Sequence, residues 1–187
     1  MKISRLCVAI PNLGSIKAET VTCLVGSLFY IGCNFTLLMP CGCYIDENRN
    51  NAAREALAMG ASHLMFIDSD MAFPDNGIAT LASRDKRVIG ANYNKRKLPP
   101  ESTVKTIGGK GIPTYPFKCE VVATGFMLIQ TDIFKILDKP WFFYEYDSEQ
   151  DDTIGEDVYF CKKAQAKGID VWCDPTIEVK HIGDYLY

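Results

Sequence analysis

The sequence predicts a doubly wound α/β fold, in which helices cover both faces of a central sheet. Up to residue 67, apolar strand-like runs and helical segments alternate in the order strand, helix, strand, helix, strand. The third of these runs, His63–Ile67, is apolar at nearly every position, as is typical of the middle of a parallel sheet. The length of 187 residues, with 48% hydrophobic and 23% charged residues, fits one globular domain.

The first half of the chain is predicted to contain three strands and two helices. The first helix carries Glu19 near its amino end, where an acidic side chain complements the helix dipole. The second helix ends before Gly60, a residue type that commonly stops helices. In chain order, the predicted elements are a strand at 2–10, a loop at 11–14, a helix at 18–31, a strand at 35–39, a helix at 46–59 and a strand at 63–67.

The second half is predicted to alternate strands and short helices around two loops. Segment 92–116 is rich in Lys, Arg, Gly and Pro, so we expect a long loop with a hairpin, and loops of this length usually carry function. We expect a kink at Thr124-Gly125, and we expect Thr131 to cap a helix. The predicted elements are a helix at 74–83, strands at 87–91 and 119–129, a helix at 131–137, an aromatic strand at 141–146, an acidic loop at 147–153, a helix at 156–167 before Gly168, a strand at 169–173 and a tail at 176–187.

Charge and cysteine content exclude some classes of function. Lys and Arg number 20 and Asp and Glu number 23, so the net charge is −3. We therefore expect no electrostatic binding of nucleic acid by the protein as a whole, although a local basic patch can still contact it. The eight cysteines form no C-x-x-C pair, and with two histidines a structural zinc site has little support. We expect the cysteines to be mostly buried and reduced, and the protein to be cytoplasmic.

Segment 20–45 contains no charged residue and is long enough to cross a membrane. Five Gly, Asn and Pro residues interrupt it, and Gly32-Cys33-Asn34 is typical of a helix end followed by a strand. The amino-terminal apolar run at 6–10 is too short for a secretory signal, and Pro11 ends it. We therefore expect neither stable membrane insertion nor a secretory signal.

Two acidic residues, Asp68 and Asp70, follow the third predicted strand directly. Residues two apart share one side of an extended chain, so the two carboxylates converge at the sheet edge where open α/β proteins bind ligands. Two neighbouring negative charges are costly unless a cation or protons neutralise them, and a divalent metal that bridges to substrate phosphates is the natural partner. The alternative is a solvated turn in which Asp caps the next helix.

Two later motifs are candidates for catalysis and metal binding. Gly155-Glu156-Asp157 opens a helix, where acidic residues commonly complement the dipole; the functional interpretation is a general base for an acceptor hydroxyl. Because the helix dipole lowers the pKa of a carboxylate, such a base has to be buried. His181 follows a strand-like run, and an imidazole added to carboxylates favours manganese over magnesium. The alternative is an ordinary surface or packed histidine.

Charged residues cluster in two segments of opposite sign. Segment 84–97 contains six basic residues and one acidic residue. Lys95 and Arg96 would lie near a diphosphate or an anionic acceptor, or the segment is simply a solvated surface. Segment 145–157 contains seven acidic residues and no basic one, which indicates either a mobile loop near a cationic centre or solvent exposure.

Together these motifs resemble the GT-A fold glycosyltransferases, close to the inverting family 2 and to its compact phage and viral versions. The match spans nearly the whole chain. Val8-Ala9-Ile10-Pro11 is similar to the opening strand and nucleotide-side loop of that family, and segment 66–71 is similar to its Asp-x-Asp signature. Segment 123–129 is similar to the strand that lines the sugar and acceptor pocket. Segment 155–161, with Gly168, Trp172 and Asp174-Pro175, is similar to the Glu-Asp helix and the next strand, and His181 stands where a metal-binding histidine would follow.

The resemblance implies a mixed, mainly parallel sheet with helices on both faces. It implies one domain over 1–187, with a nucleotide-binding half at 1–92 and an acceptor-binding half at 93–187. The reaction would transfer a hexose from a nucleoside-diphosphate sugar, with UDP favoured over GDP, to an acceptor hydroxyl. Mn²⁺ or Mg²⁺ would be the cofactor, and a single displacement would invert the anomeric centre, with retention as the alternative. The location would be the cytoplasm, that of the host if the protein is viral.

The resemblance also implies roles for individual residues. Asp157 would be the catalytic base, with Glu156 beside it in acceptor or sugar binding. Asp68, Asp70 and His181 would bind the metal. The donor-binding residues would be Pro11, Arg49, Asp68, Ser69, Asp70, Lys95, Thr124 and Gly125.

Three other functions are kept as alternatives. A non-catalytic nucleotide-sugar-binding module would bind the donor without releasing diphosphate. A haloacid-dehalogenase-type phosphatase carries its Asp pair after the first strand, whereas here it follows the third. A sugar-nucleotide pyrophosphorylase needs a Gly-rich, Arg-bearing loop that Pro11-Asn12-Leu13-Gly14 does not supply. The acceptor is left open among glycans, lipid-linked sugars, proteins and nucleic acids.

Overall fold

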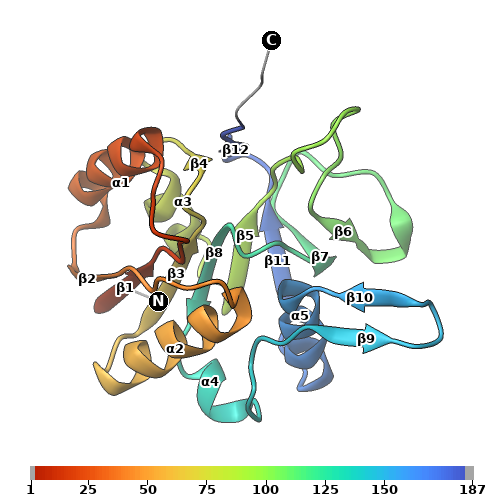
Figure 1. Ribbon diagram of the computed structural model, residues 1–187. Coiled ribbons are helices and arrows are strands. Elements are labelled where there is room, and N and C mark those ends of the chain that lie inside the picture. The colour runs from red at the N-terminus through yellow and green to blue at the C-terminus, as the bar shows by residue number, and fades with distance from the viewer. Residues whose placement is uncertain (1–2, 184–187) are drawn as a thin grey trace.

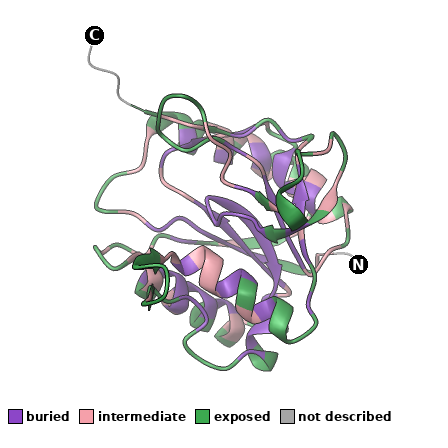
Figure 2. Cartoon of the chain, turned by 90° about the vertical axis from the view of Figure 1, so that its right-hand side faces the viewer, coloured by how far each residue is buried: buried purple, intermediate pink, exposed green. Residues whose placement is uncertain are grey.

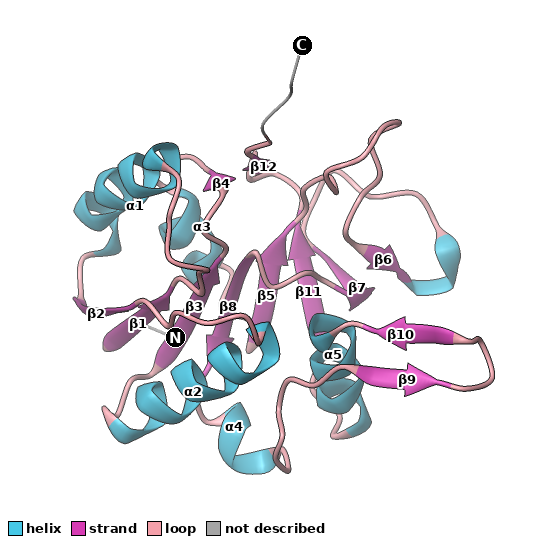
Figure 3. Ribbon diagram, viewed as in Figure 1, coloured by secondary structure: helices cyan, strands magenta, loops and turns pink. Residues whose placement is uncertain are grey.

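A mixed β-sheet of eight strands forms the centre of the molecule, with helices on both faces (Figures 1 and 3). The computed structural model describes residues 3–183, so residue 2 of the first expected strand and residues 184–187 of the expected tail lie outside the described residues. From edge to edge, the strands are β2 (Asn34–Leu38), β1 (Arg5–Ala9), β3 (His63–Ile67), β8 (Phe126–Gln130), β5 (Val88–Ala91), β11 (Val171–Asp174), β7 (Phe117–Val121) and β6 (Lys105–Thr106).

Strand direction divides the sheet into two parallel groups. β1 pairs in parallel with β2 and β3, and β5 pairs in parallel with β11, whereas β8 lies antiparallel between β3 and β5. β7 and β6 continue the sheet antiparallel beyond β11. Of the seven neighbouring pairs in the described chain, three are therefore parallel. The mixed sheet with helices on both faces agrees with the predicted fold class, and its first three strands form the doubly wound unit. The expectation that the sheet is mainly parallel is wrong, because β8, β7 and β6 join it antiparallel.

The helices form two layers around the buried strands, as Figure 2 shows. In β1, Leu6 and Val8 belong to the apolar core under α1 and α3, while Cys7 and Ala9 belong to the core on the opposite face, because successive side chains of a strand alternate between faces. The helices are α1 (Ala18–Ile31) and α3 (Gly77–Ser83) on the first face, α2 (Ile45–Ala58), α4 (Ile133–Ile136) and α5 (Glu156–Ala166) on the second, and the short 3₁₀ helix η1 (Ile107–Gly109).

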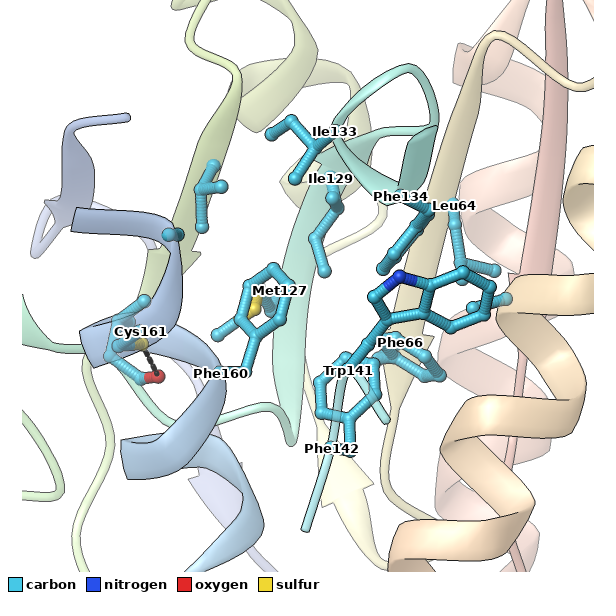
Figure 4. Close-up of a cluster of buried hydrophobic side chains, with 14 of the residues drawn as sticks. Leu64, Phe66, Met127, Ile129, Ile133, Phe134, Trp141, Phe142, Phe160 and Cys161 are labelled. Carbon is cyan, nitrogen blue, oxygen red and sulfur yellow. Dashed lines mark hydrogen bonds between the residues drawn. The ribbon is translucent and has the colours of Figure 1, made fainter. Parts of the chain in front are cut away.

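An aromatic cluster on the α5 side joins the two halves of the chain (Figure 4). The ring of Phe142 stacks on Phe160 of α5, with 4.8 Å between centroids, and meets Phe66 of β3 edge-on at 5.4 Å. Phe134 of α4 packs against both Trp141 and Phe142. Each buried aromatic ring removes about 150–250 Å² from water, so this cluster is a strong link between β3 and α5.

The strand expected over 141–146 is wrong for most of its length. The backbone N–H groups of Trp141 and Phe142 donate to the side-chain oxygen of Asn50 at 3.0 and 3.2 Å, so they are not available to a neighbouring strand. Only the end of the segment is extended, in β9 (Glu145–Asp147).

Three further expectations need correction. The acidic loop expected at 147–153 is the turn and second strand of a hairpin, in which β10 (Asp152–Ile154) pairs with β9. The strand expected over 119–129 is two strands, β7 and β8, which separate near Thr124-Gly125 because they belong to different places in the sheet. The hydroxyl of Thr131 does not cap α4, since it donates to the carbonyl of Ala61.

Several elements lie where the sequence predicts them, and two short strands are additional. α1 and β3 match the predicted bounds, and α1 ends at Gly32, whose φ of 60° is the left-handed conformation that glycine favours. The loop at 92–116 contains the expected hairpin, with a β-bridge between Asn94 and Ser102. The additional strands are β4 (Met71–Ala72) and β12 (Lys180–His181), which pair with each other.

The uncharged segment 20–45 folds as most of α1, β2 and the following loop. No helix within residues 3–183 is long and apolar enough to cross a membrane. All eight cysteines are free thiols. Four of them are buried, two are partly buried, and Cys41 and Cys43 are exposed in the loop after β2. The expectation of buried cysteines therefore holds for the sheet and α5 but not for this loop.

Candidate functional site

A cavity of about 520 Å³ opens at the carboxyl ends of β1 and β3, the edge at which the sequence predicts ligand binding. The predicted site residues among its lining are Pro11, Arg49, Asp68, Ser69, Asp70, Glu156 and His181. Those not among its lining are Lys95, Thr124, Gly125 and Asp157. Lys17 and Tyr144 also line the cavity, and the sequence analysis did not select them because neither belongs to a recognisable motif.

A buried arginine joins the two acidic motifs. The side chain of Arg49, on α2, donates from Nη2 to Oδ1 of Asp68 at 2.8 Å and from Nε to Oε1 of Glu156 at 3.1 Å. Only 2% of Arg49 is exposed. Burial alone would lower the pKa of Arg49, but the two neighbouring carboxylates raise it above its usual value. The guanidinium thus fixes the positions of Asp68 and Glu156 and offsets part of their negative charge.

The second acidic residue of the first motif, Asp70, is placed by the pairing of β4 with β12. His181 lies opposite Met71 in this pair, and the N–H of Ile182 donates to the carbonyl of Asp70 at 2.8 Å. The carboxylate of Asp70 forms an ion pair with Arg96, which comes from the loop after β5. Asp68 and Asp70 are therefore each paired with a different guanidinium.

The backbone holds one ring nitrogen of His181, which lines the cavity. Its Nδ1 lies 2.8 Å from the backbone carbonyl of Asn94, and because a carbonyl only accepts, Nδ1 carries the hydrogen. The ring also packs edge-on against Tyr93, with 4.7 Å between centroids. In the neutral imidazole, Nε2 is then the nitrogen with a lone pair for a ligand.

Gly125, next to the buried Thr124, supports the site from behind. The N–H of Gly125 donates to the hydroxyl of Tyr93 at 3.0 Å, and its carbonyl accepts from the N–H of Asp68 at 3.0 Å. A side-chain carbon at Gly125 would lie 2.3 Å from the Tyr93 hydroxyl and 2.9 Å from Oδ2 of Asp68, so this position has no room for one. Burial, together with the charge of Asp68, raises the pKa of Tyr93 well above its usual value.

The carboxyl of Asp157 has a pKa raised above its ordinary value. Burial is the main cause that raises the pKa of Asp157 to about 6, and the neighbouring charge of Glu156 adds to it. The N–H of Val158, which donates to Asp157 at 2.7 Å, and the charge of Arg49 oppose this rise. Burial therefore outweighs the favourable helix start, as a general base at this position requires.

Tyr144 marks the opening of the cavity near the same helix. It is about half exposed, and its hydroxyl lies near the carboxylate of Glu156. Burial of the hydroxyl and the charge of Glu156 raise the pKa of Tyr144 above its usual value. Glu156 is thus bound by Arg49 and lies near Tyr144.

The expected metal site is not assembled in advance. Asp68, Asp70 and His181 line one cavity, but within residues 3–183 no group of three or more His, Cys, Asp and Glu side chains is arranged to hold a metal ion. In this arrangement Arg49 binds Asp68, and Arg96 forms an ion pair with Asp70. The chemistry of the donors nevertheless fits Mn²⁺, which accepts both carboxylate oxygen and imidazole nitrogen.

Lys95 lies on the far side of Arg96 from the first cavity. A second cavity of about 770 Å³ shares Arg96 and His181 with the first and is also lined by Lys95 and Lys180. Lys95 forms an ion pair with Glu101 across the hairpin of the 92–116 loop. The structure thus separates Lys95 from the predicted donor-binding residues that it brings together.

No family model and no curated protein matches this sequence. Among solved structures, the viral protein A197 from STIV is 18% identical, with a TM-score of 0.71 over 96% of this chain and 86% of that one. GalNAc-T7, solved with UDP, GalNAc and Mn²⁺, is 13% identical, with a TM-score of 0.57 over 97% of this chain and 44% of its own. The inositol-1-phosphate CTP transferase from T. maritima is 14% identical, with a TM-score of 0.50 over 97% of this chain and 90% of its own.

These likenesses show the fold. The chain has the GT-A-type fold of nucleotide-diphospho-sugar glycosyltransferases, as the sequence motifs predict. A transferase that uses CTP shares the architecture, so the reaction has to be argued from the residues of the site.

Proposed function

We propose that this protein is a glycosyltransferase that uses a divalent metal ion to move a hexose from a nucleoside-diphosphate sugar to an acceptor hydroxyl. The observation that carries the proposal is the Arg49 bridge, which ties the Asp-x-Asp motif at Asp68 to the Glu-Asp helix at Glu156. A leaving diphosphate needs positive charge and an attacking hydroxyl needs a base. Asp68 and Glu156, one residue of each motif, line a single cavity, and Asp157 follows Glu156 on α5.

Asp157 would act as the general base. Its carboxylate takes the proton of the acceptor hydroxyl while the hydroxyl oxygen forms a bond to the anomeric carbon. The bond from that carbon to the diphosphate oxygen breaks on the opposite side, and the electron pair leaves with the nucleoside diphosphate, so the anomeric configuration inverts. A pKa of about 6 leaves Asp157 mostly ionised at neutral pH while keeping it more basic than an ordinary carboxylate.

Asp70 and His181, with Asp68, would hold the metal ion. When bound, Mn²⁺ or Mg²⁺ supplies positive charge that neutralises the departing diphosphate. Arg96 would have to leave Asp70 for the ion to bind there, and it then adds its own charge to the cavity wall beside Lys17. Cationic side chains in the cavity wall suit a leaving diphosphate, whose negative charge grows as it departs.

The donor would bind across the first half of the chain. Pro11 and Arg49 line the part of the cavity next to β1 and α2, where we place the nucleotide, with UDP favoured over GDP. We assign residues 1–92 to donor binding and 93–187 to acceptor binding. That a structure of GalNAc-T7 contains UDP and Mn²⁺ within the same fold supports this choice of ligands.

A thermal-shift panel of nucleotide sugars tests donor binding. With Mn²⁺ present, a UDP-sugar should raise the melting temperature, because a ligand that binds only the folded state stabilises it by mass action. EDTA should remove most of the shift. Asp70→Ala should abolish the metal-supported shift, and Asp138→Ala, at an exposed carboxylate that pairs with Lys167, is the matched control. Unchanged affinity in Asp70→Ala would refute the metal site.

Product analysis separates the proposal from its alternatives. A glycosyltransferase releases nucleoside diphosphate from a nucleotide sugar, whereas a nucleotidyltransferase releases pyrophosphate from a nucleoside triphosphate. A binding module shows the thermal shift and releases neither. Pyrophosphate release from CTP, without diphosphate release from any sugar donor, would favour the nucleotidyltransferase reaction of the T. maritima neighbour.

A further inference from the structure

The uncharged segment 20–45 gives the molecule an apolar edge that the proposed reaction does not use. We propose that this edge pairs with the same edge of a second copy of the chain, through β2 and the outer flank of α1. This inference is independent of the proposed function. We call the surface the β2 edge; its residues are Val21, Val25, Leu28, Phe29, Phe35, Leu37 and Met39.

The α1 part of the β2 edge is a stripe of exposed apolar side chains. Val21, Val25 and Phe29 follow one another at a spacing of four residues and are 43%, 51% and 86% exposed. Residues four apart lie above one another on a helix, so they form one flank. The other flank packs towards α3, since Gly26 approaches the side chain of Asp75 so closely that a side-chain carbon would not fit. The apolar stripe therefore faces away from α3, towards β2.

The strand part of the β2 edge lies next to this stripe. β2 is the outermost strand of the sheet, as Figure 1 shows at the side where α1 lies. Phe35 and Leu37 pair with Leu6 and Val8 of β1, which belong to the core under α1, so their side chains share that face. They are 40% and 37% exposed, and Met39 beyond them is 57% exposed.

The backbone of β2 is open to a further strand. The carbonyl of Leu38 accepts from the N–H of Ile10 at 2.8 Å, so the backbone groups of Leu38 turn towards β1. Because these groups alternate in direction along a strand, those of Phe35 and Leu37 turn outwards. Natural edge strands are commonly protected by Lys, Pro or a bulge. β2 has the sequence NFTLL and none of these devices.

The absence of charge selects a second copy as the occupant. In a two-fold interface the same patch meets itself, so any charge would meet the same charge. A surface without charged residues avoids that repulsion. A lipid surface is a poorer match, because lipid tails cannot pair with outward backbone groups, and segment 20–45 offers no Lys or Arg to anionic head groups.

The geometry of β2 fixes the arrangement of the pair. An antiparallel contact with the two-fold axis at Thr36 places Phe35 opposite Leu37 of the second copy, and these residues exchange backbone hydrogen bonds. The axis is perpendicular to the sheet, so the two α1 helices lie on the same face. Their apolar stripes then meet above the joined strands.

Sedimentation velocity or light scattering on the full chain tests the pairing. At about 50 μM the protein should have twice the chain mass of 20.9 kDa. Leu37→Lys and Val25→Glu should each reduce it to the single-chain mass without changing the circular dichroism spectrum. Ile107→Lys, at a residue 53% exposed in η1 near the opposite edge of the sheet, is the matched control and should leave the dimer intact.

A disulfide test reads the register directly and does not depend on a destabilising variant. In a Cys41→Ser, Cys43→Ser background, Thr36→Cys should form a covalent dimer on mild oxidation, since residues facing each other on the axis have Cα atoms about 4.5 Å apart. Asn34→Cys is the control, because it is offset from its own copy by about 13 Å along the strands. A wild-type protein that stays monomeric at 50 μM overturns the proposal. If that monomer floats with phosphatidylcholine vesicles in a density gradient, the β2 edge binds lipid instead of a second copy. Equal cross-linking of both cysteine variants overturns the register.

Discussion

Asp157 is the residue whose protonation is expected to matter most. Its pKa of about 6 in the folded protein lies above the ordinary value of 3.8, so the folded state holds the proton more tightly than the unfolded chain. Stability from this group therefore falls as pH rises from about 4 to 6 and stays low above that. Asp157→Asn should remove this loss, which makes the variant up to about 3 kcal/mol more stable than wild type at pH 7.5 but not at pH 4.

Urea unfolding of both proteins at the two pH values measures this difference. Asp138→Asn, at an exposed carboxylate, should follow the wild type. In the transfer assay, Asp157→Asn should retain donor binding and lose turnover, and the wild-type kcat/KM should rise through a pKa near 6. Substantial turnover in the Asn variant would show that Asp157 is not the base.

Arg49 is expected to be the most costly single charge to remove. Arg49→Met leaves Asp68 and Glu156 without their buried partner, and removing one member of a buried ion pair costs about 3–5 kcal/mol. Arg49→Lys should lose less, because it keeps the charge but cannot reach both carboxylates with a planar fork. The free energy of unfolding, compared with Arg54→Met at an exposed site on the same helix, checks this. Equal losses in the two Met variants would contradict the bridge.

At the scale of elements, the connection between β7 and β8 has little room for change. Gly125→Ala should weaken donor binding at least tenfold, because the new carbon displaces Tyr93 or Asp68. Gly111→Ala is the matched control, since a side-chain carbon there meets nothing within 4 Å. Titration of the UDP-sugar with Mn²⁺ measures both. If the two variants bind alike, the close approach at Gly125 does not position Asp68.

The short pair of β4 and β12 is expected to control the position of His181. Ile182→Pro removes the N–H that donates to the carbonyl of Asp70, whereas Ile182→Ala keeps it. The Pro variant should lose most of the metal-dependent binding of nucleotide with a change in melting temperature of only a few degrees. The Ala variant should bind as the wild type does. If nucleotide binding by the Pro variant still depends on the metal, the pairing of β12 with β4 does not control the position of His181.

Local pattern predicts the elements whose side chains repeat regularly and misses those that depend on distant contacts. The bounds of α1 and β3 follow from apolar periodicity and a glycine stop. The antiparallel insertion of β8 between β3 and β5 does not, because both runs of 119–129 are equally apolar and only pairing separates them. Segment 141–144 has the composition of a strand, yet the side-chain oxygen of Asn50 accepts the backbone N–H groups of Trp141 and Phe142.

The same distinction applies to the candidate site. Asp68, Asp70 and Glu156 follow from motifs, since each stands at the end of a strand or the start of a helix. The position of Arg49 between two of them depends on how the fold places α2 and α5 on the same face of the sheet, and the pairing of Asp70 with Arg96 depends on the path of a long loop. Neither contact produces a pattern that can be recognised in the sequence.

At the scale of the whole molecule, the aromatic cluster is expected to make the two halves unfold together. Phe142→Ala removes a fully buried ring that contacts Phe66 and Phe160, and such truncations cost about 3–5 kcal/mol. The variant should still unfold in one transition, with a lower midpoint in urea. Tyr115→Ala, at a residue 66% exposed, is the control. Two separate transitions in the wild type would contradict the link.

The hairpin that follows β5 carries two contacts with opposite effects. Its Asn94 carbonyl sets which nitrogen of His181 keeps the hydrogen, and two residues later Arg96 covers Asp70. One displacement of this segment would therefore uncover the carboxylate of Asp70 and, at the same time, release the ring of His181. Under the proposed function, cation binding and loop rearrangement would then be a single coupled event, and the affinity for manganese would report where that hairpin lies.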